Sequence, residues 1–97
     1  MATAYIEEFS KLAKTGHNVM QIGQQPSVAT QAVTFTTTTP SSAFNAETRF
    51  VKITVDAEAH YLFGSAPTAT TSHPQMQADR EYWFGVTPGQ KVAFVAA

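Results

Sequence analysis

Polar and apolar residues alternate most regularly between residues 48 and 64. The first half of this segment places an apolar β-branched residue at every second position, at Val51, Ile53 and Val55. A period of two predicts a strand with one buried face and one solvated face. After a polar bend at residues 56–58, Tyr61 and Phe63 resume the alternation. The segment therefore predicts either a β-hairpin or two strands that turn a corner between sheets.

The hydrophobic pattern also favours one register for the hairpin alternative. A three-residue loop sets Val55 opposite Ala59 and brings the apolar residues of both strands to one face. In this register, Phe50 and Leu62 share the outward face with Lys52.

The N-terminal residues 4–14 are compatible with two structures. Helical spacing relates the apolar residues Tyr5, Ile6, Phe9, Leu12 and Ala13. The run is short, however, and isolated helices of this length are marginal in water. An extended arm or an edge strand is the other alternative, so that residues 1–16 are a candidate N-terminal arm. Residues 19–22 predict a short strand.

The threonine-rich segment 28–39 predicts a further strand, because its residues have high β-propensity. Val33 and Phe35 fall on one face and threonines on the other. We interpret the threonines as the solvated face of this strand. Phe44 follows in a loop, from which we expect it to fill the core.

The C-terminal third combines a long connection with two strands. Residues 65–80 show no sustained periodicity, which predicts a loop long enough to carry contacts. Tyr82 and Phe84 alternate with Trp83, so Trp83 is expected to face away from the core. Residues 91–97 are apolar on both faces, which is typical of a strand in the centre of a sheet.

Composition supports a single small β domain. The chain has 97 residues, fourteen of them threonine, and no cysteine, so neither disulfides nor thiolate metal sites reinforce it. The formal charge is −1 and only 13% of residues are charged, which gives no field to attract nucleic acid or a membrane surface. No apolar run approaches the ~20 residues of a membrane span, and the first residues lack a secretion signal. We therefore expect a soluble product made in a cytoplasm.

The titratable residues form no catalytic signature. The histidines His17, His60 and His73 lack the short spacings that put two imidazoles on one metal. Asp56, Glu58 and His60 alternate and would converge on a cation only in an extended chain; a polar turn is the favoured interpretation. No nucleophile elbow, catalytic cysteine or glycine-rich phosphate loop is present. We predict a protein without enzymatic activity, cofactor or metal.

Four stretches of the sequence resemble one group of proteins. They are residues 63–70 (FGSAPTAT), 84–93 (FGVTPGQKVA), 1–6 (MATAYI) and 48–51 (TRFV). They resemble small β-rich proteins encoded among the virion genes of tailed bacteriophages. The resemblance implies a structural virion component, in particular a capsid decoration or cement protein that bridges capsomers. The partners it implies are the major capsid protein and further copies of the chain in a homo-oligomer, without direct contact to nucleic acid or membrane.

We therefore predict an all-β antiparallel β-sandwich, jelly-roll-like, with about seven or eight strands in a single domain of residues 1–97. Exposed aromatic residues on strands mark interfaces. The residues expected to contact a partner are Trp83, Tyr5, Ile6, Phe9, Thr68 and Thr70. The alternative function is a carbohydrate- or receptor-binding module of a tail or fibre, in which Trp83 or Tyr82 stacks on a sugar.

Overall fold

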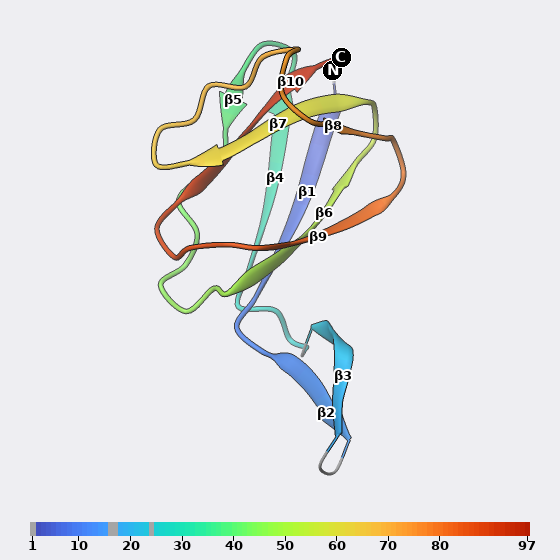
Figure 1. Cartoon of the computed structure of the whole chain (residues 1–97), viewed down its shortest axis with the longest axis vertical. Coiled ribbons are helices and arrows are strands. Elements are labelled where there is room, and N and C mark those ends of the chain that lie inside the picture. Colours follow the sequence, from blue (N-terminus) through green and yellow to red (C-terminus); the bar gives the residue numbers. More distant parts are fainter. Residues whose placement is uncertain (1, 16–17, 24) are drawn as a thin grey trace.

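The computed structural model describes residues 2–15, 18–23 and 25–97, and every regular element in these residues is a β-strand (Figure 1). The strands are β1 (Ala2–Phe9), β2 (Leu12–Thr15), β3 (Asn18–Gly23), β4 (Ala29–Phe35), β5 (Thr39–Pro40), β6 (Phe50–Val55), β7 (Ala59–Gly64), β8 (Gln75–Met76), β9 (Glu81–Gly85) and β10 (Lys91–Ala96). The all-β prediction is confirmed. These strands outnumber the expected seven or eight. Two of them, β5 and β8, are only two residues long each, too short for a periodic pattern to predict.

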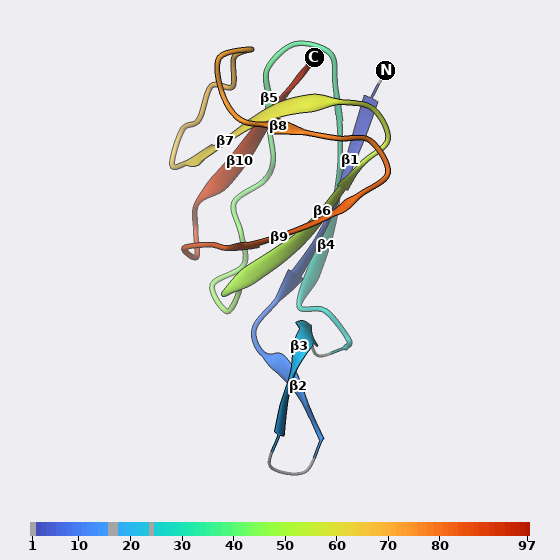
Figure 2. The same cartoon turned by 45° about the vertical axis from the view of Figure 1, so that its right-hand side comes forward.

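Eight strands form two four-stranded antiparallel sheets that enclose the core (Figures 1 and 2). The first sheet has the strand order β4-β1-β6-β9 and the second has the order β5-β10-β7-β8. The predicted antiparallel β-sandwich is therefore confirmed. A jelly-roll connection pattern is a finer prediction that this strand order does not confirm.

Side chains from both sheets fill the space between them. The Phe35 ring of the first sheet stacks on the Phe94 ring of the second, with ring centroids 5.4 Å apart. Phe44 is buried from the coil before β6, as expected from the sequence. The buried cluster comprises Ala2, Ala4, Ile6, Val33, Phe35, Phe44, Val51, Ile53, Val55, Ala59, Met76, Val92 and Phe94. Partly buried residues at its margin include Tyr61, Phe63, Tyr82 and Phe84.

Strands β6 and β7 turn a corner between the two sheets. β6 pairs with β1 and β9, whereas β7 pairs with β10 and β8. The corner alternative is therefore confirmed and the hairpin register is wrong. The inward faces of both strands still meet in the core, because the two layers face each other. Phe50 and Leu62 consequently lie on different sheets instead of sharing one outward face.

Strand β1 lies in the middle of the first sheet, where β4 and β6 pair with it on either side. Residues 4–9 and 12–14 thus lie in strands on either side of a bend, so the extended alternative is confirmed and the helix alternative is wrong. β1 is, however, a central strand and not an edge strand. Ala4 and Ile6 point into the core, while Tyr5 between them is exposed. Pairing on two sides overrides the helical spacing of the apolar residues, since a short isolated helix gains little by itself.

Strands β2 and β3 form a hairpin that extends beyond the sandwich; we call these two strands the β2–β3 arm (Figures 1 and 2). β1 continues into β2, and β3 returns into β4. The arm accounts for the elongated shape, whose principal extents are 44 × 25 × 20 Å. The short strand predicted for residues 19–22 is confirmed in β3.

The remaining predicted strands are present, although β4 ends at Phe35 and not at residue 39 as predicted. In β4, Val33 and Phe35 are buried and Thr34 is exposed. β10 lies between β5 and β7, so it is central in its sheet as its two apolar faces indicated. Gly89 adopts a φ of +83° in the turn before β10, a conformation that favours glycine.

A buried carboxylate ties the coil before β6 to the first sheet. Glu8 is 1% exposed and points between the sheets. Its Oε1 accepts hydrogen bonds from the Thr48 hydroxyl (2.7 Å) and the Asn45 N–H (2.9 Å), and its Oε2 accepts one from the Gln31 amide (3.0 Å). Burial of a charge is costly unless hydrogen bonds compensate it. Glu8 therefore fixes the 45–48 turn, which delivers the chain into β6.

Candidate interaction surface

Strand pairing arranges the outward side chains of the first sheet in rows. Glu7 lies opposite Lys52, and Lys52 lies opposite Trp83. The next row toward the arm contains Phe9 opposite Phe50. The outer face therefore changes from a charged row to an aromatic row at the end from which the arm extends.

The aromatic row and Trp83 form one cluster of rings. Ring centroids are 5.4 Å apart for Phe9 and Phe50, 5.6 Å for Phe9 and Trp83, and 6.0 Å for Phe50 and Trp83. Phe9 is covered from the other side by the arm, because a Cβ built at Gly23 would overlap its ring. As a result, Phe9 is buried, whereas Trp83 remains 42% exposed.

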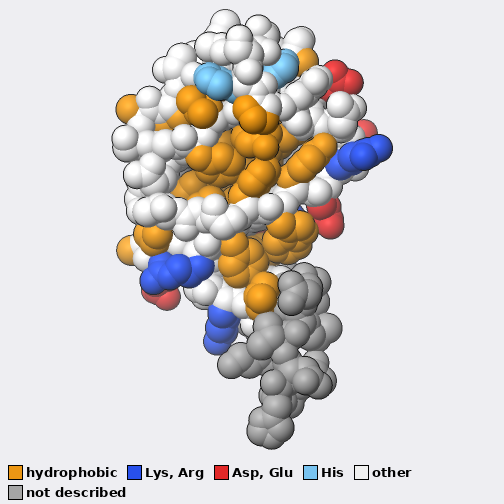
Figure 3. All heavy atoms as spheres, viewed as in Figure 1, with side chains coloured by type: hydrophobic (Ala, Val, Ile, Leu, Met, Phe, Trp, Pro, Cys, Tyr) orange, Lys and Arg blue, Asp and Glu red, His pale blue; other side chains and the backbone are white. Residues whose placement is uncertain are grey.

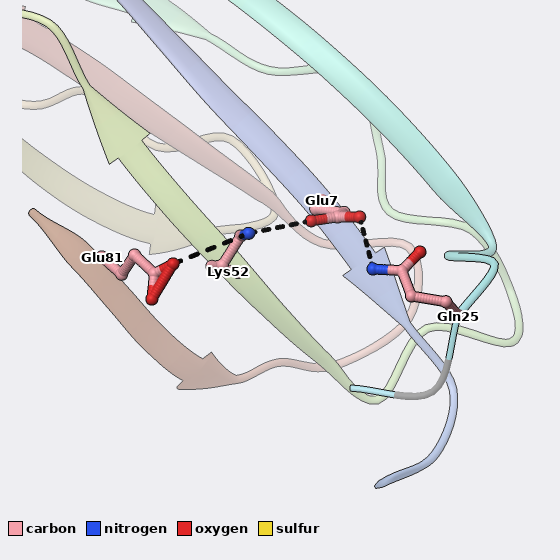
Figure 4. A network of polar contacts seen from close by, with 4 residues as sticks. All are labelled: Glu7, Gln25, Lys52 and Glu81. Atoms are coloured by element: carbon pink, nitrogen blue, oxygen red, sulfur yellow. Dashed lines mark hydrogen bonds and ion pairs between the residues drawn. The ribbon is translucent and has the colours of Figure 1, made fainter. Parts of the chain in front are cut away.

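A polar network crosses the charged row (Figure 4). Lys52 Nζ lies 3.1 Å from Glu7 Oε1 and 3.8 Å from Glu81 Oε2. The Gln25 amide donates to Glu7 Oε2 at 3.0 Å. This amide and Lys52 lower the pKa of the Glu7 carboxyl below its ordinary value, against the opposing effect of partial burial. Because the ion pairs are partly solvated, they orient Lys52 more than they stabilise the fold.

Two of the six predicted contact residues share this outer face. Tyr5 is 55% exposed and borders a shallow hollow of about 380 Å³, together with Glu7, Thr30, Ala32, Lys52 and Thr54. Trp83 is exposed on the same face, as its alternation in β9 predicted.

Two further predicted contact residues, Ile6 and Phe9, are buried in this chain, because Ile6 points into the core and Phe9 lies under the arm. Neither presents its side chain to a partner.

The other two, Thr68 and Thr70, lie in the loop between β7 and β8. Both are exposed on either side of Ala69, which is buried. The Ala69 N–H donates to the Thr38 hydroxyl at 2.9 Å, and the Thr70 N–H donates to His73 Nδ1 at 2.9 Å. The loop is therefore tied down, and the six predicted residues do not form one patch.

A second apolar surface lies at the open side of the sandwich, between β7 and β9 (Figure 3). The ring centroids of Tyr61 and Phe63 lie 5.2 and 5.0 Å from that of Phe84. Partial burial, with a smaller contribution from Tyr82, raises the pKa of Tyr61. The sequence assigned these residues to the core, and alternation alone gives no signal that the sandwich is open along this side.

The candidate cation ligands turn to different partners. Asp56 Oδ1 accepts the Thr3 N–H at 2.7 Å, Glu58 Oε2 accepts the Gln75 amide at 2.8 Å, and His60 Nδ1 lies 2.8 Å from the His73 carbonyl. Across residues 2–15, 18–23 and 25–97, no group of three or more His, Asp or Glu residues is placed to hold a metal. These same residues contain no helix able to cross a membrane. His17 lies outside the described residues.

Comparisons of the chain with protein-family models, with curated proteins and with solved structures found no match. The fold therefore defines the class of protein, an antiparallel β-sandwich. Its distinguishing surface features are an outer face with exposed aromatic residues, an open side and the β2–β3 arm.

Proposed function

We propose that this protein is a non-enzymatic structural component of a tailed-phage virion, specifically a decoration or cement protein bound to the major capsid protein. The observation that carries the proposal is the pair of exposed rings, Tyr5 and Trp83, on the outer face of the first sheet. Exposed aromatic residues on an otherwise polar face are typical of protein interfaces. The resemblance of the sequence to small virion proteins supplies the kind of particle.

In this proposal the action is mechanical. The outer face of the first sheet lies on the capsid, with Tyr5 and Trp83 as anchors, because Tyr and Trp are enriched among the residues that dominate binding energy. The two-layered sandwich acts as a rigid bridge between capsomers. Symmetry repeats the contact over the particle, so that modest affinities at single sites add up through multivalency.

Rebinding to virions tests the proposal. Particles of the encoding phage, prepared without this protein, are mixed with the purified chain, separated on a gradient and quantified by mass spectrometry. We expect the Tyr5→Ala variant to bind about tenfold more weakly, a typical loss for an aromatic anchor. The Tyr5→Phe variant keeps the ring and is the matched control, with binding close to that of the natural chain. Absence of the protein from purified virions would overturn the proposal, as would equal binding of both variants.

A carbohydrate-binding module is the second candidate. It is favoured by the shallow hollow beside Tyr5, where Glu7, Lys52 and Thr54 offer hydrogen-bonding groups next to an aromatic ring. Sugars bind such mixed surfaces by stacking on a ring and by hydrogen bonds to polar neighbours. Glycan-array binding that Tyr5→Ala abolishes, without attachment to capsids, would favour this function over the first.

A further inference from the structure

Among the residues that the structure describes, the β2–β3 arm is a two-stranded ribbon without a third strand. Its strands pair with each other, and neither packs extensively on another strand of the described chain (Figure 2). An isolated two-stranded hairpin is at best marginally stable in water. The arm nevertheless has an apolar sequence, with Leu12, Val19, Met20 and Ile22. A ribbon with this composition and so few neighbours would gain stability from a surface that covers it.

The free edge of β9 is suited to pair with an added strand. The Val86 N–H donates to the Arg49 carbonyl at 3.0 Å. This bond shows which residue pairs of the β6–β9 ladder are hydrogen-bonded. Hydrogen-bonded and non-bonded pairs alternate along an antiparallel ladder. The N–H and C=O groups of Glu81, Trp83 and Gly85 therefore point away from β6. All three residues are exposed, and β9 has no neighbour on this side.

The same edge borders the open side of the sandwich. Tyr61, Phe63 and Phe84 leave an apolar surface between β7 and β9 (Figure 3). A strand added to β9 would extend the first sheet and cover part of this surface. Main-chain pairing of this kind is a recurrent mode of strand recognition.

The charges of the arm and the body are complementary. Residues 10–23 hold two of the six basic residues, Lys11 and Lys14, and none of the seven acidic ones. Residues 10–23 thus carry a formal charge of +2, and the rest of the chain carries −3. Four acidic residues lie at the β6–β7 corner and the start of β9, namely Asp56, Glu58, Asp79 and Glu81. Arg80 lies among them, and Lys52 Nζ lies 3.8 Å from Glu81 Oε2, so the four acidic residues outnumber the basic residues beside them.

We infer that the β2–β3 arm of one copy docks on the free edge of β9 in a second copy. Within one copy the arm leads away from the body, as the prolongation of β1 and β4 (Figure 1). The second copy supplies what each element lacks, since the arm gains a third strand and the open edge gains a partner. Attraction between the lysines of residues 10–23 and the acidic corner orients the two copies. The inference rests on the proposed function only for the biological setting, in which it specifies the contact between copies. The contact itself is a property of the isolated protein.

Proline substitution at the edge is the sharpest test. Gly85 is not among the glycines with positive φ and a Cβ built there meets no atom within 4 Å, so Ala fits the site. Proline removes an outward N–H and leaves the β6–β9 ladder intact, as tolerated on edge strands. Gly85→Ala keeps the N–H and is the matched control. Sedimentation velocity over a concentration series measures self-association, and circular dichroism measures folding.

We expect reversible self-association of the natural chain and of Gly85→Ala, and a dissociation constant at least about tenfold higher for Gly85→Pro. The double variant Lys11→Glu/Lys14→Glu tests the other side of the contact, and added salt should weaken association of the natural chain. If Gly85→Pro fails to fold, the lysine variant decides. A natural chain that is monomeric at all concentrations would overturn the inference, as would undiminished association of a folded Gly85→Pro variant or of the lysine variant. Particle binding is measured separately, so failure of the virion role would be recognised independently.

Discussion

Replacement of Trp83 by alanine tests how far the outer aromatic cluster supports the fold as well as the surface. The side chain is 42% exposed, so somewhat more than half of it is covered, chiefly by the rings of Phe9 and Phe50. For a large aromatic side chain this corresponds to about 130 Å² removed from water, or about 3 kcal/mol at roughly 25 cal/mol per Å². The alanine methyl retains a little of this burial. We expect a loss of about 2–3 kcal/mol in the free energy of unfolding, or about 10–20 °C in Tm.

Urea unfolding followed by far-ultraviolet circular dichroism measures this loss without relying on tryptophan fluorescence. The matched variant Trp83→Phe keeps a ring against Phe9 and Phe50, and we expect it to lose no more than about 1.5 kcal/mol. If Trp83→Ala unfolds at the same urea concentration as the natural chain, the ring contacts contribute nothing and the reasoning is refuted. Equal losses for Ala and Phe would show that the effect does not come from stacking.

The remaining predictions concern single positions. Glu8→Ala should lose about 3–5 kcal/mol in the free energy of unfolding, because the buried Thr48 hydroxyl is left without its acceptor. Urea unfolding should show a smaller loss for Glu8→Gln, and equal losses would contradict the hydrogen-bond account. Gly23→Ala should lose about 1–3 kcal/mol in the free energy of unfolding, because the added methyl group displaces the Phe9 ring. A thermal melt unchanged from that of the natural chain would show that the backbone at the base of the arm shifts without cost. Because the pKa of Glu7 is lowered in the folded state, the stability that its carboxylate contributes is present above pH 4.5 and is lost as the pH falls through the folded-state pKa. Thermal melts of Glu7→Gln and of the natural chain should therefore differ slightly at pH 7, by less than about 1 kcal/mol, and converge in acid. A difference in stability that persists in acid would contradict this sign.

The inward and outward faces of most strands could be predicted because alternation is a local property. Val51, Ile53 and Val55 point inward whichever strand lies beside them, and Trp83 points outward for the same reason. The central position of β10 was likewise evident from apolar residues on both of its faces. These predictions need only the pleat of a single strand.

Strand neighbours could not be predicted, because they depend on residues far apart in the sequence. The same alternation fits a hairpin and a corner, and only the pairing of β6 with both β1 and β9 decides between them. The burial of Phe9 depends on Gly23, which comes from the returning strand of the arm. Glu8 was also overlooked, since its donors Thr48 and Asn45 lie 40 and 37 positions away. No local pattern marks a carboxylate that will be buried by distant donors.

The outer face of the first sheet was predicted only in part. Tyr5 and Trp83 are exposed on it as expected, yet Ile6 and Phe9 are buried. The sequence analysis named Ile6 and Phe9 among the contact residues while the helical and extended alternatives for residues 4–14 were both open. In a strand, neighbours such as Tyr5 and Ile6 must point to opposite faces.

Electron cryo-microscopy of the encoding phage is the most direct test of the proposed function. We predict density for the sandwich at the junctions between capsomers, with Tyr5 and Trp83 facing the major capsid protein and Thr68 away from it. Particles whose capsid surface carries no such density, in a preparation where the intact chain remains free in the lysate, would contradict the account.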